Sequence, residues 1–171
     1  PKGMDPSFYT ELIQLAQAQN IPVVFDASGS FLRAGLEGQP TYVKPNQDEL
    51  AQIAGYDITS LNMAYEVGME IQARYHTSPI ITLGEEGGLA ILSDRAYRFS
   101  ALPVDVINTA GAGDGVLAGL AASIHRNEPI ETGIRLGIAA ATAVLLTPGT
   151  ADCRRRDVER LLEQVELIPW P

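Results

Sequence analysis

The sequence has a single cysteine, Cys153, in 171 residues. One cysteine excludes a disulfide framework or a cysteine metal site within the chain, and it favours a reducing compartment, which we expect to be the cytoplasm. The only two histidines, His76 and His125, lie far apart in the sequence, which argues against a zinc site. No apolar run is long enough to span a membrane, so we expect no membrane partner.

Basic residues are also scarce, because 12 lysines and arginines stand against 21 acidic residues and the formal net charge is −9. The one basic cluster, Arg154–Arg156, is interpreted as the solvated start of a helix. Nucleic-acid binding requires a basic surface, so we expect no nucleic-acid partner. A hydrophobic share of 46% is typical of a globular chain, and the length suffices for one α/β domain.

Short apolar runs alternate with segments of helical periodicity along the chain. The predicted strands are residues 22–26, 41–43, 80–83 and 104–108, with a hairpin formed by 88–93 and 96–101. The predicted helices are residues 7–20, 30–37, 60–76, 113–126, 130–146 and 154–166, with one more that begins near residue 47. This alternation predicts an α/β fold, a doubly wound and mostly parallel sheet with helices on both faces, in one domain over residues 1–171.

The polar and glycine-rich parts of the chain lie at predicted strand ends. In parallel sheets, ligands bind outside the carboxyl ends of the strands, so we expect the functional site there. The segments concerned are Asp26, Lys44–Asn46, Thr82–Gly87 and Asn108–Asp114.

The segment "TAGAGDG" combines an anion site with a carboxylate. Gly111 and Gly113 permit close approach of a ligand, and the helix that begins here offers free N–H groups and the positive end of its dipole. Asp114 in the first turn would repel a phosphate, which makes sense if it accepts a proton from a hydroxyl that attacks the phosphorus. The alternative is a first-turn acid that the helix dipole favours.

Other nucleotide-binding motifs fit poorly. The stretch "GDGVLA", residues 113–118, matches a loose G-x-G-x-x-A dinucleotide pattern, but the acid expected after the next strand is missing. A Walker A sequence is absent from the whole chain. A Rossmann oxidoreductase is therefore a weak alternative.

Asn46 and Glu49 in "KPNQDEL" lie three residues apart at a predicted helix start. An amide and an acid suit Mg²⁺ held mainly through water beside phosphates, and Lys44 would neutralise phosphate charge. The alternative is a capping box, with Asn46 as the N-cap and Glu49 as its partner. The segment "TLGEEGG", residues 82–88, also has a structural alternative, a glycine turn between two strands.

Taken in order, "KPNQDEL", "ITLGEEGGLAIL", "NTAGAGDGVLAG" and Gly149-Thr150 closely resemble the pfkB-type, ribokinase-like sugar kinases. The resemblance runs through essentially the whole chain. The stretch "VVFDASGSFLRAGL" is similar to the branch that phosphorylates sugar phosphates, namely 1-phosphofructokinase, tagatose-6-phosphate kinase and the minor 6-phosphofructokinase.

The resemblance implies a role for each matching residue. Asp114 matches the catalytic base, and the backbone N–H groups of the anion hole match Gly111, Ala112 and Gly113. The pair that organises Mg²⁺ and the ATP phosphates matches Asn46 and Glu49. The positions that line the nucleotide site match Lys44, Thr82, Gly84 and Gly87, with adenine near Ala140 and Thr142.

The chain departs from the family pattern in three respects. Asn108 stands where many members have an aspartate that helps a monovalent cation site, which leaves potassium dependence open, although the sugar-phosphate branch commonly has asparagine. Gly115 replaces a more usual serine or threonine. Family members are also about twice as long, so the resemblance implies the C-terminal, nucleotide-binding and catalytic half, without the sugar-binding and lid half.

The sequence therefore predicts ATP-dependent phosphoryl transfer to a hydroxyl of a phosphorylated ketohexose. The resemblance implies ATP and Mg²⁺ as cofactors, a sugar phosphate as substrate, and a homodimer for the full-length protein. Two alternatives stay open, a kinase for an unphosphorylated sugar or nucleoside, and a non-catalytic nucleotide-binding fragment.

Overall fold

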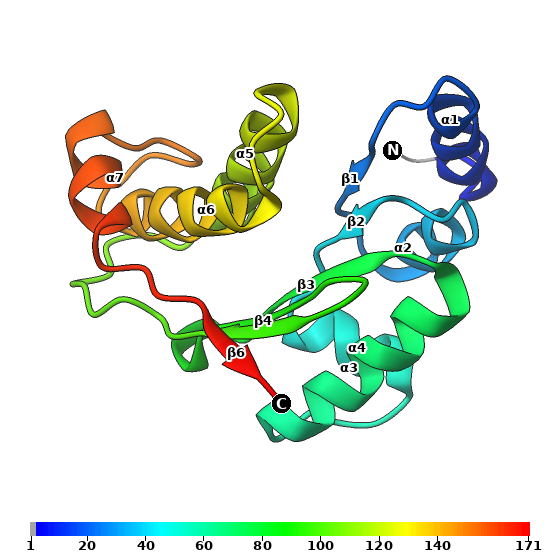
Figure 1. Ribbon diagram of the computed structural model, residues 1–171, viewed down its shortest axis with the longest axis horizontal. Helices are drawn as coiled ribbons and strands as arrows, with labels where there is room; N and C mark the ends of the chain where they lie inside the picture. The colour runs from blue at the N-terminus through cyan, green and yellow to red at the C-terminus, as the bar shows by residue number, and fades with distance from the viewer. Residues whose placement is uncertain (1–2) are drawn as a thin grey trace. The chain divides into compact units, whose positions relative to one another are not determined.

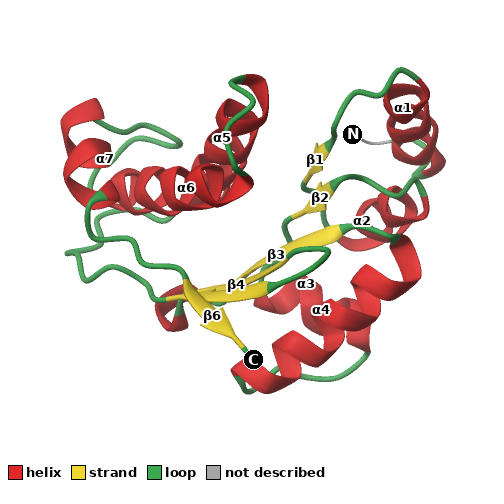
Figure 2. Ribbon diagram, viewed as in Figure 1, coloured by secondary structure: helices red, strands yellow, loops and turns green. Residues whose placement is uncertain are grey.

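The computed structural model describes residues 3–171 and contains seven α-helices, one 3₁₀ turn and six strands (Figures 1 and 2). The chain divides into two compact units. Unit 1 comprises Pro1–Gly84, Gly88–Ala96 and Pro171, and unit 2 comprises Glu85–Gly87 and Tyr97–Trp170. The α/β class agrees with the prediction from the sequence.

Unit 1 contains four strands that neighbour one another in chain order, β1 (Val24–Phe25), β2 (Tyr42–Val43), β3 (Ser78–Thr82) and β4 (Gly88–Ile91). The first three are parallel, with Val24 opposite Tyr42, and β4 runs antiparallel to β3. In β3, Ile80 and Ile81 both have no exposed surface, as expected for a strand that is covered on both faces.

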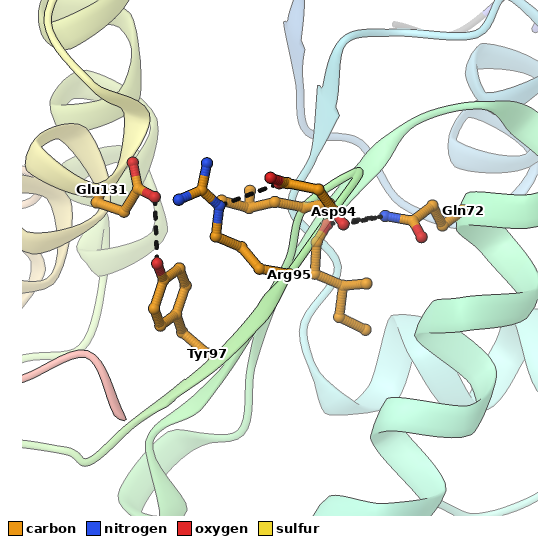
Figure 3. A network of polar contacts seen from close by, with 7 residues as sticks. Gln72, Asp94, Arg95, Tyr97 and Glu131 are labelled. Carbon is orange, nitrogen blue, oxygen red and sulfur yellow. Dashed lines mark hydrogen bonds and ion pairs between the residues drawn. The ribbon is translucent and has the colours of Figure 1, made fainter. Parts of the chain in front are cut away.

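The helices of unit 1 are α1 (Ser7–Ala18), α2 (Gly29–Glu37), α3 (Gln47–Ala54) and α4 (Leu61–Tyr75). Helix α4 buries Ala64, Val67 and Ile71, whose spacing of three and four residues gives the helix one apolar face. The amide of Gln72 on α4 donates to the carbonyls of Ile91 and Leu92, which ties this helix to the end of β4 (Figure 3).

Unit 2 contains most of β5 (Ala96–Phe99), α5 (Ala112–His125), α6 (Ile130–Leu145), α7 (Arg155–Leu162) and β6 (Ile168–Trp170). The short 3₁₀ turn η1 (Gly84–Glu86) falls at the boundary of the two units. Helices α5 and α6 lie in close backbone contact, because a Cβ at Gly119 would come 2.7 Å from the carbonyl oxygen of Gly133. The hydroxyl of Tyr97 in β5 donates to the Glu131 carboxylate in the first turn of α6 at 3.3 Å (Figure 3).

The structure corrects three predictions from the sequence. Residues 104–108 form no strand, because the Ile107 N–H donates to the Leu145 carbonyl at 2.7 Å and this segment is held by the end of α6. Helix α7 ends at Leu162 and not at residue 166. Strand β6 was not predicted, since Pro169 interrupts a very short apolar run.

The other predicted elements are present, with shorter ends for the first two strands. Among the residues that the structure describes, no helix combines the length and apolar character needed to cross a membrane.

Candidate functional site

Two of the predicted motifs meet at the carboxyl ends of neighbouring strands in unit 1. Asn46 and Thr82 face each other in an isolated parallel bridge, and the Thr82 N–H donates to the Pro45 carbonyl at 3.1 Å. Lys44 precedes this bridge at the end of β2, and Gly84 follows it after β3. These residues therefore lie at neighbouring strand ends within this unit, and their assignment to a functional site stays a prediction.

Lys44 is buried and forms an ion pair with a residue from the neighbouring strand. Its Nζ lies 3.0 Å from Oδ2 of Asp26, and the two side chains are 5% and 23% exposed. The Lys44 N–H donates to the Phe25 carbonyl at 3.0 Å, which fixes the register that brings the pair together. Sequence reasoning placed Asp26 at a strand end but gave it no role, although an acid directly after a buried strand was a usable signal.

Asn46 and Glu49 form a capping box at the start of α3. The Asn46 side chain accepts from the Glu49 N–H, and the Glu49 carboxylate accepts from the Asn46 N–H, both at 2.9 Å. The structural alternative considered for this motif is therefore present. The capping box uses one carboxylate oxygen of Glu49 and one lone pair of the Asn46 amide oxygen. The second Glu49 oxygen and the other lone pair of Asn46 can therefore bind another ligand.

A carboxylate and an amide fit an ion that keeps most of its water ligands and also binds phosphates, as Mg²⁺ does. Across residues 3–171, no group of three or more histidine, cysteine, aspartate or glutamate side chains is arranged to hold a metal ion.

Gly84 and Gly87 flank the turn after β3, and both have positive φ, +59° and +85°. Gly87 belongs to unit 2, where a Cβ would lie 2.7 Å from Cα of Ser100 and 2.8 Å from the Ala101 nitrogen. Only glycine therefore fits at this position. The turn exposes Glu85 and Glu86.

The glycine-rich segment of unit 2 forms the start of α5. Gly111 is its N-cap with φ +86°, and a Cβ there would lie 2.6 Å from Cα of Ala151. Within residues 3–171, Ala112 donates its N–H to the Thr109 carbonyl at 3.3 Å, whereas the N–H groups of Gly111, Gly113 and Asp114 have no acceptor. These free N–H groups at a helix start form a partial positive charge, which suits an anion.

Asp114 lies in the first turn of α5 and its side chain is exposed. Among the described residues, its carboxylate has neither a hydrogen bond nor an ion pair. An unpaired carboxylate beside free N–H groups can accept a proton from a group that reacts with a bound anion. Free N–H groups and an unpaired carboxylate thus lie together in this segment, while their roles as anion site and proton acceptor stay predictions.

Asn108 joins this segment to the loop after α6. Its side-chain amide donates to the carbonyls of Pro148 and Gly149 at 3.2 and 3.3 Å, and its side-chain oxygen accepts from the Ala110 N–H at 3.0 Å. The Ala151 N–H donates to the Ala110 carbonyl at 3.1 Å. Sequence reasoning missed this structural role, although it had grouped Gly149 with the same motifs.

Ala140 lies on the face of α6 that meets the start of α5. A Cβ at Gly115 would lie 2.9 Å from the carbonyl carbon of Ala140 and 2.8 Å from Cα of Ala141. Because Gly115 has no side chain, the start of α5 can approach the backbone of α6 this closely. The predicted site residues are thus distributed over both units, with Lys44, Asn46, Glu49, Thr82 and Gly84 in unit 1 and Gly87, Gly111–Asp114 and Ala140 in unit 2.

Comparison with known proteins finds similarity to phosphofructokinases. The chain is 30% identical over 164 residues to the ATP-dependent 6-phosphofructokinase isozyme 2 of Mycobacterium tuberculosis, a match that covers 95% of this chain and 48% of the relative. It is 29% identical over 169 residues to the 1-phosphofructokinase of Bacillus subtilis, covering 98% and 54% of the two chains. The chain thus spans about half the length of these curated relatives.

A solved structure also matches nearly all of this chain and about half of its own. The crystal structure of phosphofructokinase-2 from Escherichia coli in complex with potassium matches with a TM-score of 0.88 and 30% identity, over 96% of this chain and 54% of that one. The model of the pfkB family of carbohydrate kinases matches residues 1–157. The chain therefore belongs to the pfkB family of carbohydrate kinases.

Proposed function

We propose that this chain carries the nucleotide-binding and proton-accepting residues of an ATP-dependent kinase that phosphorylates a hydroxyl of a phosphorylated ketohexose. The proposal rests mainly on Asp114, whose exposed carboxylate has no partner among residues 3–171 and lies beside the free N–H groups of Gly113 and Asp114. In this proposal, Asp114 takes the proton of the sugar hydroxyl while these N–H groups stabilise negative charge on the transferred phosphoryl.

The residues of unit 1 would hold the nucleotide. Asn46 and Glu49 would bind water ligands of Mg²⁺, which neutralises phosphate charge when it is bound. Lys44 supplies a basic side chain at the carboxyl end of β2, and its pairing with Asp26 keeps that side chain in one position. Positioning and electrostatics, with no covalent intermediate, are sufficient for phosphoryl transfer of this kind.

The substrate class is supported by relatives named as 6-phosphofructokinase and 1-phosphofructokinase. We extend this to a phosphorylated ketohexose as acceptor for the protein that contains this chain, and we expect a cytoplasmic location and a homodimer.

The experiment that tests this function measures ATP consumption with fructose 6-phosphate, fructose 1-phosphate and tagatose 6-phosphate, together with the intact mass of the purified protein. Replacing Asp114 by Asn should lower kcat by about 10²–10⁴-fold, as expected for a lost general base, and leave ATP affinity nearly unchanged. Asp105→Asn, an exposed acid in the loop before α5, is the matched control and should keep kcat.

The second candidate is a nucleotide-binding chain without kinase activity, the alternative that the sequence left open. Binding of MgATP without turnover on any of the three sugar phosphates would support this candidate. An unchanged kcat in Asp114→Asn would exclude Asp114 as the proton acceptor.

A further inference from the structure

The loop that leads into α5 is bonded to the loop that follows α6, residues 147–152, within unit 2. The half-buried side chain of Asn108 forms one of the links. Its nitrogen donates to the carbonyls of Pro148 and Gly149 at 3.2 and 3.3 Å, and its oxygen accepts from the Ala110 N–H at 3.0 Å. A single side-chain amide thus closes the turn before α5 and attaches that turn to the second loop.

The backbones of the two loops are also in direct contact. The Ala151 N–H donates to the Ala110 carbonyl at 3.1 Å, and a Cβ on Gly111 would lie 2.6 Å from Cα of Ala151. Both Gly111 and Ala151 have left-handed backbones, with φ of +86° and +52°. This conformation is unfavourable for alanine and persists only where the surrounding structure holds it. The loop after α6 is therefore a braced support for the turn before α5.

The turn sets the directions of the free N–H groups at the start of α5. The N–H groups of Gly111, Gly113 and Asp114 have no acceptor among residues 3–171. Each N–H lies in the plane of its peptide unit, so its direction follows from the backbone dihedral angles of the turn. Glycine restricts these angles less than any other residue, so contacts from outside the turn have to supply the restriction. The bonds of Asn108 supply part of it.

We propose that Asn108 is a positioning residue, which holds these N–H groups in the orientation that stabilises the transferred phosphoryl group. The inference deepens the proposed function and rests on it for the identity of the anion. Asn108 acts through the backbone, by way of the Ala110 N–H and the carbonyls of Pro148 and Gly149. An amide suits this task because it offers donors and an acceptor at once, whereas a carboxylate offers only acceptors.

The first measurement is steady-state kinetics of the wild type and Asn108→Ala, with MgATP and the sugar phosphate that the wild type phosphorylates. We expect kcat to fall about 10–100-fold and the KM for ATP to change by less than about twofold, because displaced N–H groups act mainly on charge in the transition state. Asn108→Ser should restore part of kcat, since a serine hydroxyl can also accept from the Ala110 N–H.

Ser123 offers a matched control at the other end of α5. Its buried hydroxyl donates to the carbonyls of Glu128 and Pro129 at 3.4 and 2.9 Å, so Ser123→Ala also removes a donor that two carbonyls share. We expect Ser123→Ala and Asn108→Ala to lower the thermal unfolding midpoint by similar amounts. Only Asn108→Ala should lower kcat, because the start of α5 is unaffected in Ser123→Ala. Unchanged kcat in Asn108→Ala, or an equal fall in both variants, would overturn the inference.

A second measurement separates this inference from the proposed function. If the wild type phosphorylates none of the three sugar phosphates, the proposed function fails, and titration with inorganic phosphate tests the inference through the amide NMR signals of Gly113 and Asp114. Asn108→Ala should then require about tenfold more phosphate than the wild type and Ser123→Ala, as expected for weakened hydrogen bonds to an anion. Equal phosphate affinity in all three, or no phosphate response in the wild type, would overturn the inference. Asn108→Ser replaces Asn108→Ala in both measurements, with smaller effects of the same sign, if Asn108→Ala does not fold.

Discussion

Lys44 and Asp26 form an ion pair at the carboxyl ends of β2 and β1, with Nζ 3.0 Å from Oδ2 and the lysine side chain only 5% exposed. Removing the carboxylate would leave a buried ammonium without a counter-charge. Losses of this kind reach about 3–5 kcal/mol, and we expect the lower end for Asp26→Asn because that carboxylate is 23% exposed. The free energy of unfolding from urea titration measures this loss.

Two further variants make that measurement specific. Lys44→Met removes the buried charge itself and leaves a carboxylate that water partly reaches, so it should destabilise unit 1 less than Asp26→Asn does. Asp48→Asn changes an exposed acid in the first turn of α3 and should alter stability by about 0.5 kcal/mol or less. Equal losses for Asp26→Asn and Asp48→Asn would show that the ion pair contributes nothing.

Gly119 marks the closest approach of α5 and α6. Alanine is favoured over glycine in a helix by about 1 kcal/mol, but here its Cβ would lie 2.7 Å from the Gly133 carbonyl oxygen and overlap the backbone of Gly137. The two backbones would have to move apart, so we expect Gly119→Ala to destabilise unit 2 by about 1–3 kcal/mol. Thermal unfolding measures this change, and Ala118→Ser, at an exposed position of the same helix, should leave the midpoint nearly unchanged.

Asn108 provides a test of cation dependence. The side-chain nitrogen of Asn108 donates to the carbonyls of Pro148 and Gly149. Asn108→Asp replaces this nitrogen by a charged oxygen, so three oxygens would face one another. We expect a loss of about 1–3 kcal/mol, because the donor of both carbonyls is removed. A monovalent cation should restore part of it, so the unfolding midpoint of the variant should rise in potassium chloride relative to choline chloride. The wild type, whose amide satisfies the carbonyls, should show no such difference.

The local elements could be predicted from the sequence because they depend on short-range patterns. Helix α4 shows apolar residues at helical spacing and β3 a continuous apolar run, and both are present in the structure. The segment 104–108 has the composition of a strand, yet its hydrogen bond goes to Leu145, about 40 residues later, which no local pattern reveals.

The site was predictable in its residue types but not in its contacts. The order of the motifs placed Asn46 and Thr82 at strand ends, and the sheet brings them together. The pairing of Lys44 with Asp26 depends on the register of two strands, and the ties from Asn108 depend on the packing of a distant loop. Such contacts follow from tertiary structure, so propensity and spacing could not supply them.

Glu49 allows the capping and magnesium roles of the α3 start to be separated. Glu49→Gln keeps an oxygen that can accept from the Asn46 N–H, so the capping box persists and stability should change by about 0.5 kcal/mol or less. If Glu49 also orients water ligands of Mg²⁺, loss of its charge should weaken Mg²⁺-dependent ATP binding by about 10–100-fold. Calorimetric titration of ATP at several Mg²⁺ concentrations measures this, with Asp48→Asn as the control that removes an equal charge one residue earlier. Unchanged ATP binding in Glu49→Gln would leave Glu49 a capping residue only, whereas weakening in both variants would indicate a general charge effect at the start of the helix.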